Sequence, residues 1–154
     1  MPETSTPDAE SPAPAGRVLG LDLGQARIGV AISDDTRRVA VPLGTVRTGA
    51  PQDLKAIAAI VRDEGVSEVV VGHPLRMSGG AGEAAEQAET FAEVLRDVLH
   101  LPVRLQDERL STVEAERALD RAAVRGRDRR AVVDQTAATV ILQAYLDRTR
   151  GSAG

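Results

Sequence analysis

The sequence has no cysteine and almost no aromatic residues, and both absences restrict its chemistry. Without cysteine, disulfides, thiolate metal sites and cysteine nucleophiles are excluded. His73 and His100 are the only histidines, too few for a structural zinc site. Phe91 and Tyr145 are the only aromatic residues, so bases cannot stack on an aromatic platform. This argues against single-strand-binding modules of the OB or RRM kind.

Long apolar runs are missing as well. No apolar stretch approaches the length of a membrane span, and no basic-then-apolar leader begins the chain. The sequence therefore predicts a cytoplasmic location and no membrane partner. Residues 1–16 are rich in proline and carry acids without bases, so we expect a disordered tail. Residues 17–150 have the length and composition of a single folded domain.

Positive charge is concentrated rather than abundant. The net charge is −4, and outside the tail 19 basic groups face 20 acidic ones. Eighteen of the 19 bases are arginine, and five of them fall within residues 121–130 beside a single aspartate. The planar fork of arginine suits phosphate contacts. On this feature alone, a solvated helix end is the simpler interpretation.

Hydrophobic periodicity predicts an α/β fold. Three strands come first, at 17–24, 27–34 and 39–47, and the turn at Gly24 joins the first two as a hairpin. Short apolar strands at 67–72 and 103–108 then alternate with helices, as parallel strands do. We expect helices between Pro51 and Gly65, then at 83–99, 111–121 and 128–148. The result is a five-stranded mixed sheet, antiparallel at one side and parallel at the other, with helices packed on it.

Helical spacing also predicts which residues of the 83–99 helix are buried. Ala84, Ala88, Phe91, Leu95 and Val98 recur at the intervals of one helix face. We expect this stripe to face the sheet.

Asp22 is out of place in the stretch GLDLGQARIGVAISD, because it lies between leucines in a strand. Strand alternation puts it on a face with only small neighbours, which leaves room there for a helix or a ligand. These neighbours are Gly20, Gly29, Ala31 and Ser33. Asp22 either closes a turn or reaches across this face for a cation.

Two further acids are candidates to lie near Asp22. Asp134 shares a helix face with Ala138 and Ile141, and a carboxylate on a buried stripe is costly unless it is paired or metal-bound. In QDERLST, alternation puts Asp107 and Glu108 on opposite faces and does not say which one points toward Asp22. Three converging carboxylates would suit Mg²⁺ or Mn²⁺. On the residues alone, this interpretation and structural roles for the acids are equally supported.

Four segments together resemble the YqgF (RuvX-like) family over residues 17–147. They are DLGQARIGVAISD, VVVGHPLRMSGGAG, DERLSTVEAER and VVDQTAATVILQAYL, in this order. The resemblance implies a ribonuclease H-like fold and a bacterial nuclease that processes the 5′ end of precursor 16S ribosomal RNA in ribosome biogenesis. Resolution of Holliday junctions, on branched DNA, is the alternative function. A third is a catalytically weak nucleic-acid-binding protein.

The resemblance also implies site residues. Asp22, Glu108 and Asp134 match the family's metal-binding catalytic acids, with Asp107 as a supporting acid. Gly72 and Pro74, in GHPL, are further supporting residues, although resolvases of this fold carry an acid at the end of this strand. Independently of the resemblance, the expected nucleic-acid contacts are Arg109, Arg125, Arg127, Arg129 and Arg130, although an ion pair with a neighbouring acid is an equally supported role for Arg109.

Such a site would hydrolyse phosphodiesters with two Mg²⁺ or Mn²⁺ ions about 3.5–4 Å apart and without a protein nucleophile. Residues 72–82 lack the lysine of a nucleotide-binding P-loop. Actin-like ATPases share the topology but need two such domains. The sequence leaves open RNA against branched DNA, endonuclease against exonuclease, Mg²⁺ against Mn²⁺, and monomer against homodimer.

Overall fold

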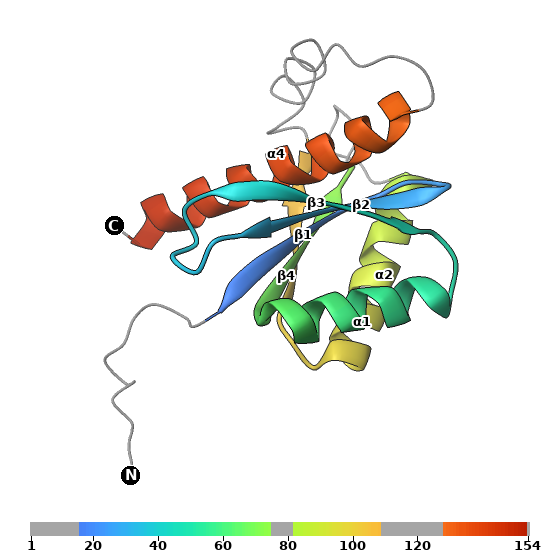
Figure 1. Ribbon diagram of the computed structural model, residues 1–154, viewed down its shortest axis with the longest axis horizontal. Coiled ribbons are helices and arrows are strands. Elements are labelled where there is room, and N and C mark those ends of the chain that lie inside the picture. The colour runs from blue at the N-terminus through green and yellow to red at the C-terminus, as the bar shows by residue number, and fades with distance from the viewer. Residues whose placement is uncertain (1–15, 75–81, 109–127, 154) are drawn as a thin grey trace.

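The computed structural model describes residues 16–74, 82–108 and 128–153, and in the last range it describes side chains from 136 to 149. A single five-stranded sheet organises this part of the chain (Figure 1). Its strands are β1 (Arg17–Leu23), β2 (Arg27–Ser33), β3 (Ala40–Arg47), β4 (Val66–His73) and β5 (Val103–Asp107). Their order across the sheet is β3-β2-β1-β4-β5. The first three strands pair antiparallel, and β1, β4 and β5 pair parallel, which confirms the predicted mixed sheet.

Helices cover both faces of the sheet. α1 (Gln52–Glu64) and α2 (Glu83–Leu99) pack on one face, and α4 (Asp128–Ala153) crosses the other (Figure 1). α1 ends at Gly65, whose φ of 68° is the left-handed conformation that glycine adopts without strain. No helix in the described ranges has the length and apolarity to cross a membrane. The predicted tail and the predicted helix at 111–121 lie outside the described residues, except for Gly16.

The larger apolar core lies between the sheet and the α1–α2 layer. Strand alternation assigned Leu19, Leu21, Ile28, Val30 and Ile32 to one face, and all five are buried in this core. They are joined by apolar residues of β4, β5, α1 and α2: Ile57, Val66, Val69, Val71, Ala88, Ala92, Leu95 and Val103. The period-two pattern of the first two strands was therefore a reliable guide to the fold.

The predicted buried stripe of α2 was wrong in part. Ala84 is exposed and Val98 is 45% exposed, whereas Ala85, Ala92 and Leu95 are buried. Two overlapping stripes of apolar residues are present in this alanine-rich helix, and both have helical spacing. The stripe that contains Ala85, Ala92 and Leu95 faces the sheet, because its small alanines allow α2 to lie close to the strands.

α4 packs against the small-residue face of the sheet. A Cβ atom on Gly20 would lie 2.8 Å from the Cβ of Leu142 and 3.3 Å from the carbonyl oxygen of Ala138. Both helix residues are fully buried. Because Gly20 has no side chain, the backbone of α4 can lie directly on β1. Much of the open space predicted beside Asp22 is therefore filled by a helix.

A buried polar cluster fixes α4 on the sheet farther along. Glu68 of β4 is only 8% exposed and accepts a hydrogen bond from the hydroxyl group of Tyr145. Its carboxylate also pairs with Arg37 at 2.7 Å and with Arg104 at 3.2 Å. Burial, followed by the neighbouring Glu68, raises the pKa of Tyr145 to about 12, so the phenol remains a donor. The bond from Tyr145 to this charged acceptor sets the position of α4 along β4.

The contact at Gly20 yields a stability prediction. Gly20→Ala should destabilise the fold by about 1–3 kcal/mol, because the new methyl group meets backbone and Cβ atoms that cannot rotate away. Thermal melting should show a fall of about 2–4 °C per kcal/mol for a domain of this size. Gly72→Ala is the matched control, since its methyl group would meet only the ends of two side chains. A Gly20→Ala protein as stable as the wild type would contradict the described packing.

Candidate active site

Two of the three predicted acids lie on the same face of the sheet. Asp22 is near the end of β1, opposite Gly29 of β2, and its face is the one that α4 covers. Glu108 directly follows the last residue of β5. The strand β4 runs between β1 and β5, so the two acids come from strands that are not neighbours.

Gly72 of β4 allows the two acids to meet. A Cβ atom on Gly72 would lie 2.6 Å from Oε2 of Glu108 and 2.8 Å from Cδ1 of Ile141 in α4. The carboxylate of Glu108 therefore lies over the bare backbone of Gly72, beneath α4. The register places Leu21 beside Val71, so Asp22 and Gly72 are the next residues along the two strands.

The carboxyl groups of Glu108 and Asp22 are in hydrogen-bonding contact. Burial raises the pKa of Glu108 above its ordinary value of 4.5, and the charge of Asp107 adds to the rise. The hydrogen bond with Asp22 and the charge of His73 oppose it. A raised pKa means that the contribution of Glu108 to stability is complete below pH 4.5 and is lost as the pH rises through the raised pKa. Two carboxyl groups in contact share either a proton or a cation.

Asp107 lies on the opposite face. It follows Val103 and Leu105 in alternation, and both of these belong to the core beneath α1 and α2. Asp107 is paired in register with His73, whose Nε2 atom lies 2.8 Å from Oε2 of Glu89 on α2. The structure therefore brings Glu108, and not Asp107, to Asp22. Sequence analysis did not identify Glu89, because nothing in its helix distinguishes it from other exposed acids.

The remaining predicted residues are only partly described. Asp134 belongs to α4, one turn before the buried Ala138, and its side chain lies outside the described residues. Within the described part of the chain, no three acids or histidines are close enough to hold a metal ion. Arg129 and Arg130 are at the beginning of α4, without described side chains, and Pro74 is the last residue before residues 75–81. Arg109, Arg125 and Arg127 lie outside the described ranges.

Several curated proteins are similar to this chain over most of its length. A protein of Anaeromyxobacter dehalogenans is 50% identical over 133 residues, which cover 86% of this chain and 97% of that protein. A protein of Roseiflexus sp. is 44% identical, and the match covers 88% of this chain and 96% of that protein. A protein of Mycobacteroides abscessus is 42% identical, and the match covers 100% of this chain and 98% of that protein. All three bear the name "Putative pre-16S rRNA nuclease".

Solved structures agree with the fold. RuvC of T. thermophilus, in a complex with a Holliday junction substrate, superposes with a TM-score of 0.55 at 15% identity, covering 89% of this chain and 97% of that one. At this identity the likeness shows a common ribonuclease H-like fold. A family model described as "RuvX: Holliday junction resolvase" matches residues 16–148. The chain belongs to the RuvX (YqgF) family.

Proposed function

We propose that this protein is a metal-dependent nuclease that hydrolyses phosphodiester bonds in precursor 16S rRNA. One observation carries the proposal: Glu108 and Asp22, from strands that are not neighbours, are brought into contact across Gly72. At neutral pH a fold gains nothing in stability from holding two ionised carboxylates together in a partly buried place. Such an arrangement is typical of sites that bind a cation.

The described donors fit a hard divalent cation. Asp22 and Glu108 supply carboxylate oxygens, the ligands preferred by Mg²⁺ and Mn²⁺, and no cysteine or described histidine competes at this face. With Asp134 as the third acid, these residues would hold one or two ions. When bound, the ion supplies Lewis-acid stabilisation of the phosphoryl charge and lowers the pKa of water.

Other residues of the chain maintain this arrangement. Gly72 leaves space for Glu108, and Ile141 of α4 closes that space from above. The charge of His73 favours the ionised form of Glu108, and Glu89 holds His73 in place. Because no protein nucleophile is needed, water is the attacking group. The acids of the site would orient the phosphodiester through the bound ion, which would stabilise the negative charge that develops on the phosphoryl group.

The names of the relatives support precursor 16S rRNA as the substrate, and the cytoplasmic location stays a prediction. A four-way DNA junction is the second candidate substrate, which the description of the family favours. Both substrates would be hydrolysed by the same acids, and they differ in how the protein must hold the nucleic-acid backbone. Metal-dependent cleavage of single-stranded RNA, precursor-like RNA and four-way junctions therefore distinguishes them.

The first prediction concerns Asp22. Asp22→Asn should reduce Mn²⁺-dependent cleavage by more than the roughly 10–100-fold that is typical of losing an outer-sphere partner of a metal. The substitution keeps the shape of the side chain and removes its charge. The measurement is the initial cleavage rate on each substrate. Thermal melting verifies that the variant is folded. A well-folded Asp22→Asn protein that cleaves like the wild type would exclude this site, since Asn serves as well as Asp in a turn.

The second prediction separates position from charge. Gly72→Ala leaves all the acids in place but pushes the carboxylate of Glu108 away from Asp22, because the new methyl group would lie 2.6 Å from Oε2. We expect cleavage to fall about 10–100-fold, with a smaller loss of melting temperature than Gly20→Ala. Equal cleavage by Gly72→Ala and wild type would show that the contact between Glu108 and Asp22 is not required.

A further inference from the structure

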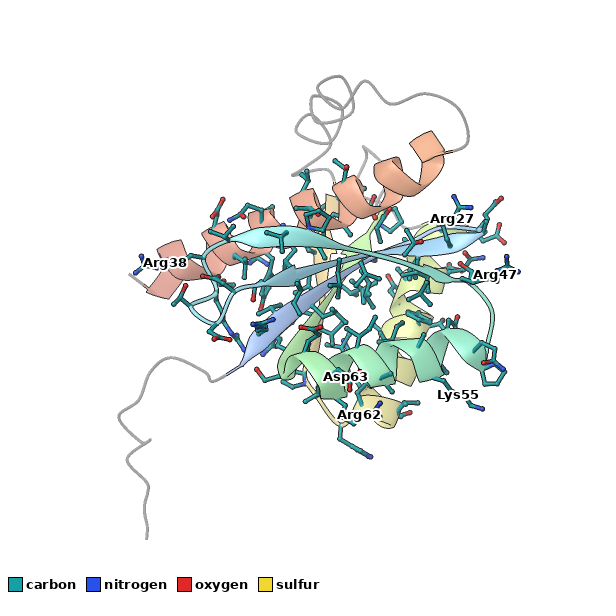
Figure 2. The ribbon with its side chains drawn as sticks, in the orientation of Figure 1. Arg27, Arg38, Arg47, Lys55, Arg62 and Asp63 are labelled. Atoms are coloured by element: carbon teal, nitrogen blue, oxygen red, sulfur yellow. The ribbon has the colours of Figure 1, made fainter. Side chains whose placement is uncertain are left out.

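A second polar feature lies at the end of the sheet where β1 turns into β2. A pocket of about 450 Å³ is lined by Gln25, Ala26, Arg27, Thr45, Arg47 and Thr48. Figure 2 shows Arg27 and Arg47 near each other at this end of the sheet. Neither arginine was singled out by the sequence, in which both are scattered among 16 others.

The strand register puts the pocket on the same face as the candidate active site. Asp22 is opposite Gly29, and Gly29 is in turn opposite Thr45. Arg27 is two residues from Gly29 on the same strand, so it points to the same face, and Arg47 is directly opposite Arg27. Diagonal neighbours of this kind are about 7–8 Å apart. Arg27 is therefore a diagonal neighbour of Asp22, and Arg47 lies one strand farther away on the same face.

The two charges are uncompensated within the described residues. Like charges directly opposite each other in a sheet are destabilising. Arg17, Arg37, Arg62 and Arg104 each pair with a carboxylate, but no described residue provides such a partner for Arg27 or Arg47. The side chain of Arg47 is exposed, and that of Arg27 is half-buried. An anion in the pocket would remove this repulsion.

We propose that this pocket binds a phosphate of the nucleic-acid strand, adjacent to the phosphate that is cleaved. Two guanidinium groups offer forked donors that match phosphate oxygens. Gln25 and Thr45 add uncharged donors, while Thr48 donates to the carbonyl oxygen of Gly24 and shapes the wall. Such binding positions the strand without reading its sequence. The position of the bound phosphate next to the cleaved bond rests on the proposed function. The binding of a phosphate by the pocket does not depend on it.

The first test measures binding without cleavage. The double variant Arg27→Gln/Arg47→Gln is compared with Lys55→Gln/Arg62→Gln, which removes the same charge from α1 on the other side of the sheet (Figure 2). Fluorescence anisotropy follows a labelled single-stranded RNA in EDTA at several salt concentrations. We expect the pocket variant to bind about tenfold more weakly, and its log–log salt slope to fall by about 0.7 for each phosphate that it no longer neutralises. The α1 variant should keep the wild-type slope.

Equal losses of affinity and slope in both double variants would overturn the proposal, because they would reflect only the total charge. Melting curves verify that each variant is folded. The single variant Arg47→Gln, at an exposed position, repeats the test with the least disturbance of the sheet.

The second test locates the phosphate. RNA or junction substrates carry one neutral methylphosphonate linkage at successive positions around the cleaved bond, and KM is measured with Mn²⁺. One linkage near that bond should raise KM for the wild type and have no further effect on the pocket variant, since both changes remove the same interaction. If the two losses add at every position, the pocket does not hold a phosphate beside the cleaved bond. Full cleavage by Asp22→Asn would instead reject the proposed nuclease site and leave the binding result standing.

Discussion

Two carboxyl groups held in contact beneath a helix are the constraint on which this structure depends. Burial and a neighbouring acid raise the pKa of Glu108, and its hydrogen bond with Asp22 only partly offsets this. The fold keeps the pair together through α4, which the Glu68–Tyr145 cluster fixes on β4. Two ionised carboxylates at this partly buried place destabilise the fold, and a bound divalent cation would offset that destabilisation.

Three glycines on one face of the sheet have three different consequences. Gly20 lets the backbone of α4 rest on β1, and Gly72 lets Glu108 cross β4 toward Asp22. Gly29 lies directly opposite Asp22 and, as a buried glycine, leaves that position without a side chain. A strand of nucleic acid lying along this face would meet the acids and then the guanidinium groups. The small-residue face thus serves helix packing, and under the proposed function it would also hold the substrate strand.

The sequence alone predicted the sheet and the faces of β1 and β2, because alternation is a local property that needs no knowledge of the partners. It could not choose between Asp107 and Glu108, since that choice depends on an empty space at Gly72 in another strand. Helical spacing in α2 fitted two stripes, and the wrong one was chosen at Ala84 and Val98. The Glu68–Tyr145 bond, across 77 residues, has no local signal. The role of Asp134 stays a prediction.

The central claim is that Glu108 and Asp22 form one cation site, and melting curves with and without Mn²⁺ test it most directly. In EDTA, Glu108→Gln should melt above the wild type, because it replaces a partly buried acid that is costly to ionise at neutral pH with a neutral donor to Asp22. Mn²⁺ should raise the melting temperature of the wild type and leave that of Glu108→Gln unchanged. A Glu108→Gln protein that melts lower in EDTA and gains as much from Mn²⁺ as the wild type would contradict the account.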